Sequence, residues 1–143
     1  MNPNTPIKIS PTGEHLPADA AEFAAVLFPA TGLMFAVGAL PKAMSHAGAV
    51  KAAAELTHAG HSDWRLPTVQ ELVSIVDYSR KQPACDLALF PDAKCDWYWT
   101  SDMSAWSPDC AWVVHFGGGG VGSLRRDGYA FVRAVRRVSP AGQ

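Results

Sequence analysis

The segment AWVVHFGGGGVGSLRR, residues 111–126, runs from an apolar stretch into four consecutive glycines. Gly117, Gly119 and Gly122 match the G-x-G-x-x-G fingerprint, whose glycines let a backbone approach a phosphate at the start of a helix. Only residues 123–143 follow, too few for the rest of a dinucleotide-binding fold, and no acidic residue lies about 20 positions on to hold a ribose. Because residues 121–124 look like a returning strand, the segment predicts a β-hairpin with the glycines at its tip.

The length and charge of the chain limit the functions open to it. A chain of 143 residues is typical of one domain with its own hydrophobic core. Its net charge of −1 gives no field that would attract nucleic acid. No apolar run reaches the roughly 18 residues that a membrane-spanning helix needs. We therefore expect neither a nucleic-acid partner nor membrane insertion.

The N-terminal sequence and the cysteines bear on the cellular compartment. MNPNTPIKIS lacks the basic and apolar regions of a signal peptide, so we expect a cytoplasmic protein, with the cell surface or a phage particle as alternatives. Three cysteines, Cys85, Cys95 and Cys110, leave at least one thiol unpaired. In a reducing cytosol all three are thiols, whereas export would allow Cys85 and Cys95 to close a small loop.

Two helices are predicted from their start signals. Ser45 is a suitable N-cap for an alanine-rich helix over 45–58, which a glycine then ends. Thr68 and Glu71 form a T-x-x-E capping box at the start of a second helix over 68–80. Apolar residues recur at helical spacing after that box.

The remaining apolar runs are short and are typical of strands. The sequence Pro-Ala-Thr-Gly joins two of them as a tight turn, and a proline-containing loop over 81–96 precedes the later ones. The predicted strands cover residues 7–9, 23–28, 33–37, 97–101, 111–116, 121–124 and 129–138. Two helices among short strands predict an α+β fold.

The order of these motifs resembles a known family. The block HSDWRLPTVQEL at 61–72 and the ending FVRAVRR at 131–137 are its most specific marks, and TGLMF, YWTSD and AWVVHFGGG occur around them in the expected order. Over residues 31–137 the chain resembles the family catalogued as domain of unknown function 1566, also called the Lcl C-terminal domain.

The resemblance implies a single C-type-lectin-like domain over 23–138, after an extended N-terminal segment at 1–22 and before a tail at 139–143. It also implies a distant relation to formylglycine-generating enzymes and to the variable ligand-binding proteins of diversity-generating retroelements. In that architecture two helices flank a small, twisted, mainly antiparallel sheet, and loops of the second half form the ligand face. Characterised members are surface or secreted adhesion modules that bind glycans or proteins. The chain departs from them in lacking an export signal and in carrying Phe35 where tryptophan is common.

His58, His61 and Asp63 form H-x-x-H-x-D, a spacing that could hold a metal ion. However, the helix is expected to end at Gly60, between the two histidines, so they need not share a face. A closed zinc site takes four ligands, and no cysteine is near in sequence. We therefore expect neither a metal nor another cofactor.

Several residues of the family motifs are expected to support the fold. Trp64 is a large apolar group placed to anchor the start of the second helix, and Arg65 can form a planar ion pair. In the last strand, alternation puts Arg133 between apolar neighbours, where it is expected to meet Asp63 or Asp102. The full set is Asp63, Trp64, Arg65, Pro67, Thr68, Glu71, Arg133 and Arg136.

Enzymatic motifs are missing. The formylglycine-generating relatives bind copper with a close pair of cysteines late in the chain, where this sequence has only Cys110. The G-x-S-x-G motif of serine hydrolases is absent, as are the Glu-Pro-Asn, Gln-Pro-Asp and Trp-Asn-Asp motifs of calcium-dependent lectins. We expect no catalytic residues and no enzymatic activity. The alternative hypothesis of a metal-dependent enzyme is supported only by the histidines of H-x-x-H-x-D.

Binding of a glycan or protein surface is better supported. The loop DMSAWSPD at 102–109 holds Trp106, and arginines and a tyrosine follow the glycine hairpin; such residues are the usual anchors of binding sites. Since sequential strands usually neighbour one another, the loop and the glycine hairpin are expected to lie side by side. The predicted ligand-binding residues are Asp102, Ser104, Trp106, Asp109, His115, Arg125, Arg126 and Tyr129. Alternatively, Trp106 folds inward and the arginines are merely solvated.

A second functional hypothesis is an intracellular or phage-encoded interaction protein that blocks or recruits a host factor. The lack of a leader favours this hypothesis, whereas the roles of characterised family members favour adhesion.

Overall fold

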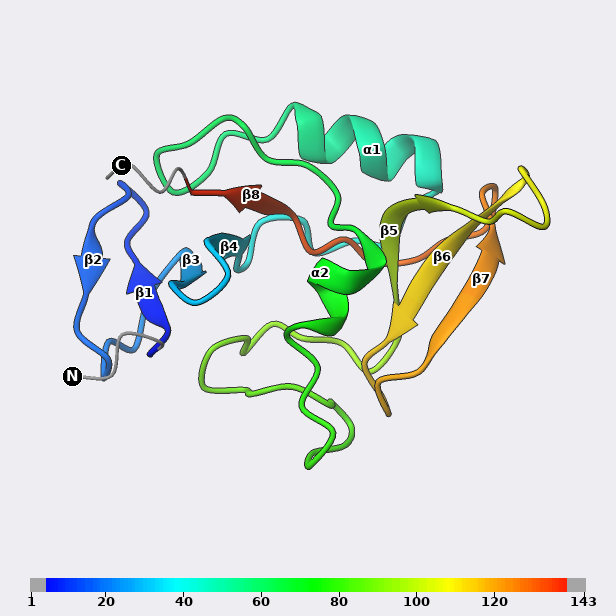
Figure 1. Ribbon diagram of the computed structural model, residues 1–143. Helices are drawn as coiled ribbons and strands as arrows, with labels where there is room; N and C mark the ends of the chain where they lie inside the picture. Colours follow the sequence, from blue (N-terminus) through cyan, green and yellow to red (C-terminus); the bar gives the residue numbers. More distant parts are fainter. Residues whose placement is uncertain (1–4, 139–143) are drawn as a thin grey trace.

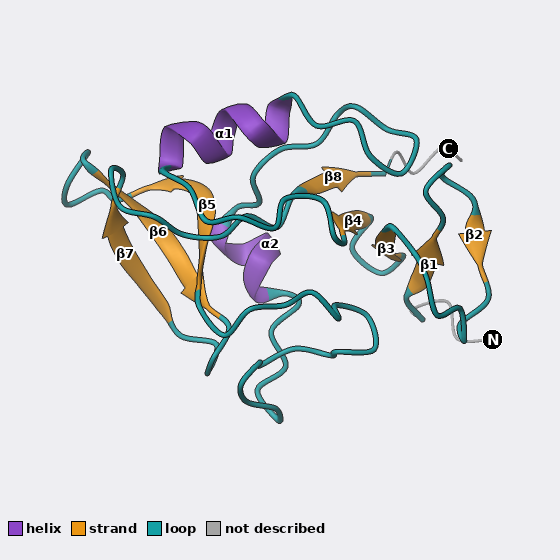
Figure 2. Cartoon of the chain, turned by 180° about the vertical axis from the view of Figure 1, so that it is seen from behind, coloured by secondary structure: helices purple, strands orange, loops and turns teal. Residues whose placement is uncertain are grey.

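A computed structural model describes residues 5–138 and shows an α+β fold with two small antiparallel sheets. One sheet has the strand order β2-β1-β3-β4-β8, and the other has the order β5-β6-β7. The sheets lie at opposite ends of the molecule, with the helices between and beside them (Figures 1 and 2). The strands are β1 (Ile7–Ile9), β2 (His15–Leu16), β3 (Ala25–Phe28), β4 (Leu33–Ala36), β5 (Trp97–Met103), β6 (Cys110–His115), β7 (Val121–Arg125) and β8 (Val135–Arg137). The helices are α1 (His46–Ala54) and α2 (Val69–Val73).

Two hydrophobic clusters cover opposite faces of the strands. Along β6, Val113 belongs to the cluster that contains Ala49 and Ala53 of α1, whereas Val114 belongs to the cluster that contains Leu72 of α2. Successive side chains of a strand point to opposite faces. The two helices therefore cover the two faces of the three-stranded sheet. The expected α+β fold is confirmed, with its strands divided between two small antiparallel sheets rather than one.

The N-terminal segment belongs to the larger sheet. β1 pairs with β3, with Ile9 opposite Ala25, and the side chain of Ile9 is fully buried in the core. The extended piece predicted at 7–9 is therefore a strand of that sheet, and a boundary at residue 22 would cut the sheet between β1 and β3.

Both helices begin at their predicted caps but end earlier than predicted. The Ser45 side chain accepts from the Gly48 N–H, and α1 ends at Ala54 because His58 turns away to pair with His61 through two backbone bonds. α2 has the predicted capping box at Thr68 but spans only five residues. Past α2 the backbone bonds to distant partners, such as the N–H of Asp77 to the carbonyl of Ala84. Hydrogen bonds outside the helical pattern thus replace the helical ones expected up to residues 58 and 80.

The last segment alternates between the two clusters as predicted but is not one strand. Ala130, Val132 and Ala134 lie in the α1-side cluster, and Val135 lies in the α2-side cluster. Only Val135–Arg137 form β8, because residues 130 and 131 bridge to Met44 and Tyr98 respectively, on different elements. Changing partners along the segment breaks the single strand expected over 129–138.

Arg133 is buried and pairs with Asp92, not with either carboxylate expected from the sequence. Its Nη1 donates to both Asp92 oxygens, at 2.9 and 2.8 Å, and to the carbonyl of Ala36 at 3.0 Å. Burial alone would raise the pKa of Asp92, but the charge and hydrogen bonds of Arg133 outweigh it and lower that pKa. Asp63 instead pairs with Arg136, whose Nε donates at 2.6 Å. The loop over 81–96 supplies Asp92, and no sequence period marked it as a partner.

The glycine run forms a β-hairpin, as predicted. The His115 N–H donates to the carbonyl of Gly120 at 2.8 Å, and Val114 is opposite Val121. The tip is packed: Gly119 has a φ of +86°, and a Cβ there would lie 2.6 Å from Val76 and 2.8 Å from Tyr78. Glycine is thus required at 119 by both backbone conformation and space.

We predict that Trp64→Ala reduces the free energy of unfolding by about 3–5 kcal/mol. Trp64 is 3% exposed, and its Nε1 donates to the carbonyls of His58 and His61 at 3.0 and 3.1 Å. Trp106→Ala is the matched control, since Trp106 is 91% exposed. Urea unfolding measures both. Equal stability of the two variants would contradict the role of Trp64 as an anchor.

A second pair of variants tests the packed hairpin. Gly119→Ala should destabilise the fold by about 1–3 kcal/mol, because the alanine must adopt a left-handed backbone conformation and its Cβ would meet Val76 and Tyr78. Gly118→Ala should change the melting temperature little, since nothing lies within 4 Å of its added Cβ. If both variants melt alike in calorimetry, the hairpin tip is not held by these contacts.

Candidate functional site

The three-stranded sheet places its two connecting loops at opposite ends. β5, β6 and β7 run antiparallel in sequence order. The loop between β5 and β6 therefore lies at one end of β6, and the glycine hairpin lies at the other. The expectation that these two loops lie side by side is wrong, because successive turns of an antiparallel meander alternate between ends. What does adjoin the β5–β6 loop is the end of β7, where Cys110 is opposite Arg125.

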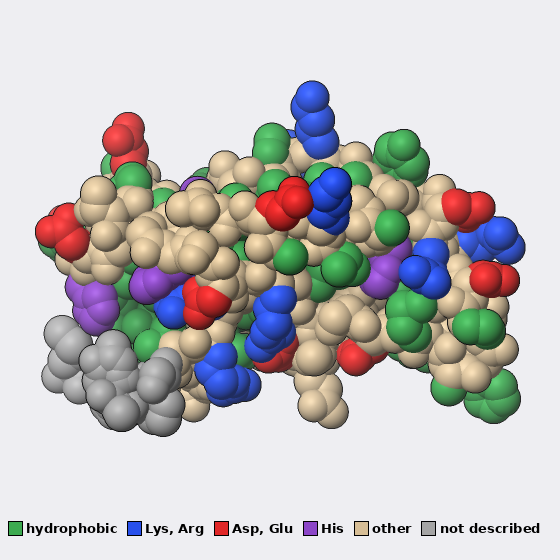
Figure 3. All heavy atoms as spheres, turned by 90° about the horizontal axis from the view of Figure 1, so that it is seen from above, with side chains coloured by type: hydrophobic (Ala, Val, Ile, Leu, Met, Phe, Trp, Pro, Cys, Tyr) green, Lys and Arg blue, Asp and Glu red, His purple; other side chains and the backbone are tan. Residues whose placement is uncertain are grey.

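Most of the predicted ligand-binding residues gather at this loop end. Trp106 is 91% exposed and Tyr129 is 71% exposed. The backbone N–H of Arg126 donates to the carbonyl of Asp109 at 2.8 Å, which joins the loop to the chain after β7. In Figure 3, hydrophobic, basic and acidic side chains crowd the end of the molecule on the side of β7. The residues at this end are Asp102, Ser104, Trp106, Asp109, Arg125, Arg126 and Tyr129.

The loop that carries Trp106 is hydrogen-bonded. Ser104 is 8% exposed, and its Oγ accepts from the N–H of Trp106 at 3.2 Å. The N–H of Ser104 donates to the carbonyl of Cys110, and the N–H of Cys110 donates to the carbonyl of Ser107, both at 3.0 Å. Ser104 thus orders the loop from inside and does not face a ligand. Trp106 does not fold inward.

His115 lies at the glycine end, away from the other predicted ligand-binding residues. Its Nδ1 accepts from the N–H of Gly117 at 2.9 Å, and its ring meets Trp97 edge to face at 4.7 Å between centroids. Both contacts stabilise the hairpin. Its assignment to the ligand-binding surface is therefore not supported by its position.

An open groove of about 700 Å³ runs between the start of α2 and one face of the three-stranded sheet. Trp112 and Val121 contribute apolar surface, and Asp102 contributes a carboxylate. Asp102 Oδ2 accepts from the N–H of Val69 at 2.8 Å, which fixes α2 against β5. The other lining residues are Thr68, Val69, Gln70 and Met103. Trp112 is half-exposed because α2 leaves this part of the sheet open, and no local sequence signal marked it.

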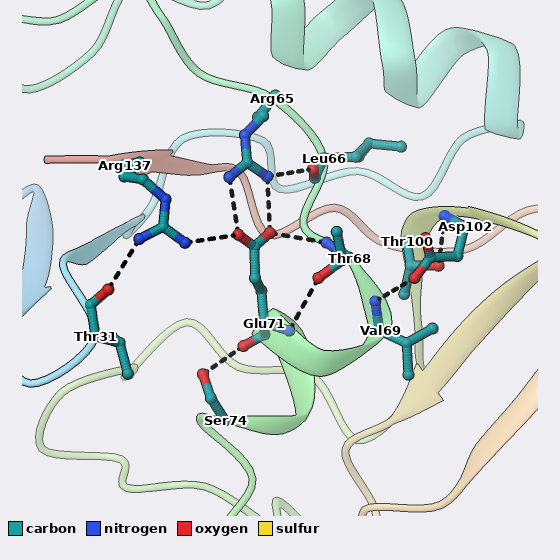
Figure 4. A network of polar contacts seen from close by, with 10 residues as sticks. All are labelled: Thr31, Arg65, Leu66, Thr68, Val69, Glu71, Ser74, Thr100, Asp102 and Arg137. Atoms are coloured by element: carbon teal, nitrogen blue, oxygen red, sulfur yellow. Dashed lines mark hydrogen bonds and ion pairs between the residues drawn. The ribbon is translucent and has the colours of Figure 1, made fainter. Parts of the chain in front are cut away.

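An ion-pair network holds the α2 wall of this groove (Figure 4). Arg65 donates to both carboxylate oxygens of Glu71, at 2.7 and 2.8 Å, and Glu71 closes the capping box by accepting from the N–H of Thr68 at 2.9 Å. Arg137, from β8, approaches the same carboxylate at 3.7 Å. The hydrogen bond from Arg65 is the main reason that the pKa of Glu71 is lowered, against the effect of burial. Glu71 thus ties α2 to the larger sheet.

Within the H-x-x-H-x-D motif, the ring of His58 has backbone partners. His58 Nε2 lies 2.7 Å from the carbonyl of Ala24 and 3.1 Å from that of Val37. Asp63 is engaged by Arg136. Within residues 5–138 no group of three or more His, Cys, Asp or Glu side chains is arranged to hold a metal ion. The motif thus contributes to packing around Trp64.

The three cysteines are free thiols in this structure. Cys85 is buried, and burial raises its pKa to about 11, so it carries a proton at neutral pH. Cys95 is exposed. The possible Cys85–Cys95 loop is therefore not formed here. Of the helices in the described part of the chain, none has the length and apolar character to cross a membrane.

We predict that Glu71→Gln lowers the free energy of unfolding by about 1–3 kcal/mol at neutral pH. Because folding lowers the pKa of Glu71, its ion pairs contribute fully above the ordinary carboxyl pKa of about 4.3 and are lost as the pH falls through the folded-state value. The difference from wild type should therefore shrink as the pH falls below the ordinary carboxyl pKa. Urea unfolding at each pH measures it. Glu22→Gln, an exposed residue, is the control and should show no such trend.

The family comparison agrees with the motif order. The Lcl C-terminal domain family matches residues 25–136, which cover most of the chain from β3 into β8. Among curated proteins, none matches the chain. The matched range includes the capping box of α2, the groove and the loop end of the three-stranded sheet. The chain therefore belongs to the Lcl C-terminal domain family.

Proposed function

We propose that the protein is a non-catalytic module that binds a protein or glycan surface through its loop end, defined as the loop 104–109 together with residues 125–129. The observation that carries the proposal is the 91% exposure of Trp106 on a hydrogen-bonded loop. Leaving so much apolar surface in water forgoes about 25 cal/mol per Å² that burial would provide. Contact with a partner would recover that free energy.

The neighbours of Trp106 suit binding by surface contact. Tyr129 is 71% exposed and offers a second aromatic ring. The Arg125 side chain is 68% exposed, and within residues 5–138 its one ion pair is with the similarly exposed Asp127, at 3.3 Å. Aromatic and arginine side chains dominate the free energy of many interfaces. An ordered loop also loses little conformational entropy on binding.

The polar groups nearby support binding rather than catalysis. The Ser104 hydroxyl is committed to the loop backbone, and the only histidine expected at this site, His115, lies at the far end of β6. A nucleophile needs a base within hydrogen-bond reach. Neither residue offers that arrangement at the loop end.

The proposal extends to the finer classification of the fold. A C-type-lectin-like relation would account for a ligand face built from loops of the second half of the chain. Two helices on opposite faces of a short sheet, with exposed aromatic residues at residues 106 and 129, support that relation. An adhesion role would follow from it.

The proposal predicts that the double variant Trp106→Ala/Arg126→Ala loses binding while folding normally. Wild-type protein is screened on a glycan array and on a protein microarray, and each positive is then titrated. The double variant should bind more weakly by about 2 kcal/mol, roughly 30-fold in Kd. Lys51→Ala, on the exposed side of α1, is the control and should bind like wild type. Weaker binding by the control, with the double variant unaffected, would place the ligand face elsewhere and refute the proposal.

A further inference from the structure

β7 is an open sheet edge in the described part of the chain. The outer edge of β5 is covered. The N–H of Trp99 donates to the carbonyl of Phe131, the N–H of Phe131 donates to the carbonyl of Trp97, and the N–H of Ser101 donates to the carbonyl of Pro67. β8 pairs with β4 and is bridged to Arg65 on its other side. β2 has only two residues. β7 has five residues, and it lies at the outside of the molecule in both ribbon views (Figures 1 and 2).

The register shows which backbone groups of β7 are unused. His115 bonds to Gly120, and Arg126 bonds to Asp109, at the two ends of the β6–β7 ladder. Residues of an antiparallel strand alternate between the two neighbouring strands. The even-numbered residues therefore pair with β6, and the N–H and C=O groups of Val121 and Ser123 point outward. Residues 5–138 offer neither residue another backbone partner.

The side chains of this edge face the groove beside α2. Val121 is opposite Val114, so it shares the face that carries Trp112, and both line the groove. Val121 is 46% exposed and Met103 is 41% exposed, which leaves apolar surface open next to unused backbone groups. An added strand would thus place alternate side chains over this groove.

The groove also carries a charge without an opposite charge. Asp102 accepts from the N–H of Val69, but no lysine or arginine among the described residues lies within 4 Å of its carboxylate. A cationic side chain entering the groove would be complementary to it. Among peptides that could add to the edge, the charge of Asp102 therefore favours those with a cationic side chain.

We propose that β7 accepts an extended peptide from a partner protein as a fourth strand, with an apolar side chain over Val121 and Trp112 and a lysine or arginine that extends across the groove toward Asp102. The backbone of the peptide bonds to the outward groups of Val121 and Ser123. Strand addition of this kind gets its affinity from main-chain bonds and its specificity from alternate side chains. The edge and groove form a second surface, which does not depend on Trp106 or on the proposed loop-end function. A glycan has no backbone that matches the strand period.

The test uses the full chain and a random library of displayed peptides about nine residues long, enough to extend past the five residues of β7. Selection should enrich sequences with an apolar residue near a lysine or arginine. The best peptide is synthesised with a fluorophore, and its Kd is measured by anisotropy. Ser123→Pro removes an outward N–H and should weaken binding at least about tenfold, whereas Ser123→Ala should stay within about twofold of wild type.

Two further arms separate the parts of the proposal. Asp102→Asn keeps an acceptor for Val69 but removes the charge, so it should erase the preference for lysine or arginine. Methylating peptide nitrogens one at a time should weaken binding only at every second position, a readout on wild-type protein that does not depend on folding of Ser123→Pro. Trp106→Ala should leave peptide binding unchanged, so failure here and failure of the loop-end function are distinguishable.

Several results would overturn the proposal. These are a selection that enriches no peptide, equal binding to Ser123→Pro and Ser123→Ala, or an effect of methylation without the two-residue period. If glycans from an array compete with the peptide for the wild-type protein but not for a variant with altered groove residues, the groove binds a sugar instead. Sedimentation that shows a dimer, dissociated by Ser123→Pro, would make β7 an interface between two copies of the chain.

Discussion

Burial on both faces of the strands is the constraint on which the rest of the structure depends. Val113 and Val114 of β6 point into different clusters, each covered by a different helix. The same holds for Met34 and Phe35 in β4. A slip of one residue would exchange the two sets, and neither cluster would pack, so the register of each strand is fixed from both sides. This is how short strands specify one fold.

Polar groups inside this arrangement are paired at points where distant segments meet. Arg133 bridges the last segment, the end of β4 and the loop that carries Asp92, while its guanidinium lies over Phe90 at 4.9 Å. Glu71 joins α2 to the larger sheet. Because one side chain in each case satisfies several partners, the two sheets are held in a fixed relation, and the groove between α2 and β5–β7 keeps its shape.

Features that depend on neighbouring residues could be predicted from the sequence. The capping box at Thr68, the burial of Trp64, the glycine hairpin and the alternation over residues 130–135 were predicted correctly because each depends on local geometry. The helix ends, the partner of Arg133 and the half-exposure of Trp112 depend on contacts between segments far apart in sequence, and no local pattern encodes them. The relative position of the two loops could have been predicted correctly, because successive turns of an antiparallel meander lie at alternate ends of its strands.

The meander therefore divides the domain by its tolerance of change. At the glycine end, residue 119 has no space for a side chain, and the ring of His115 lies close to Gly117. Substitutions there therefore destabilise the fold. At the other end, the loop 104–109 is held by backbone bonds and by one inward serine, while its remaining side chains face water. Mutation can alter those side chains without disturbing the core. Such a division would let a lineage vary the proposed binding surface while the fold stays constant.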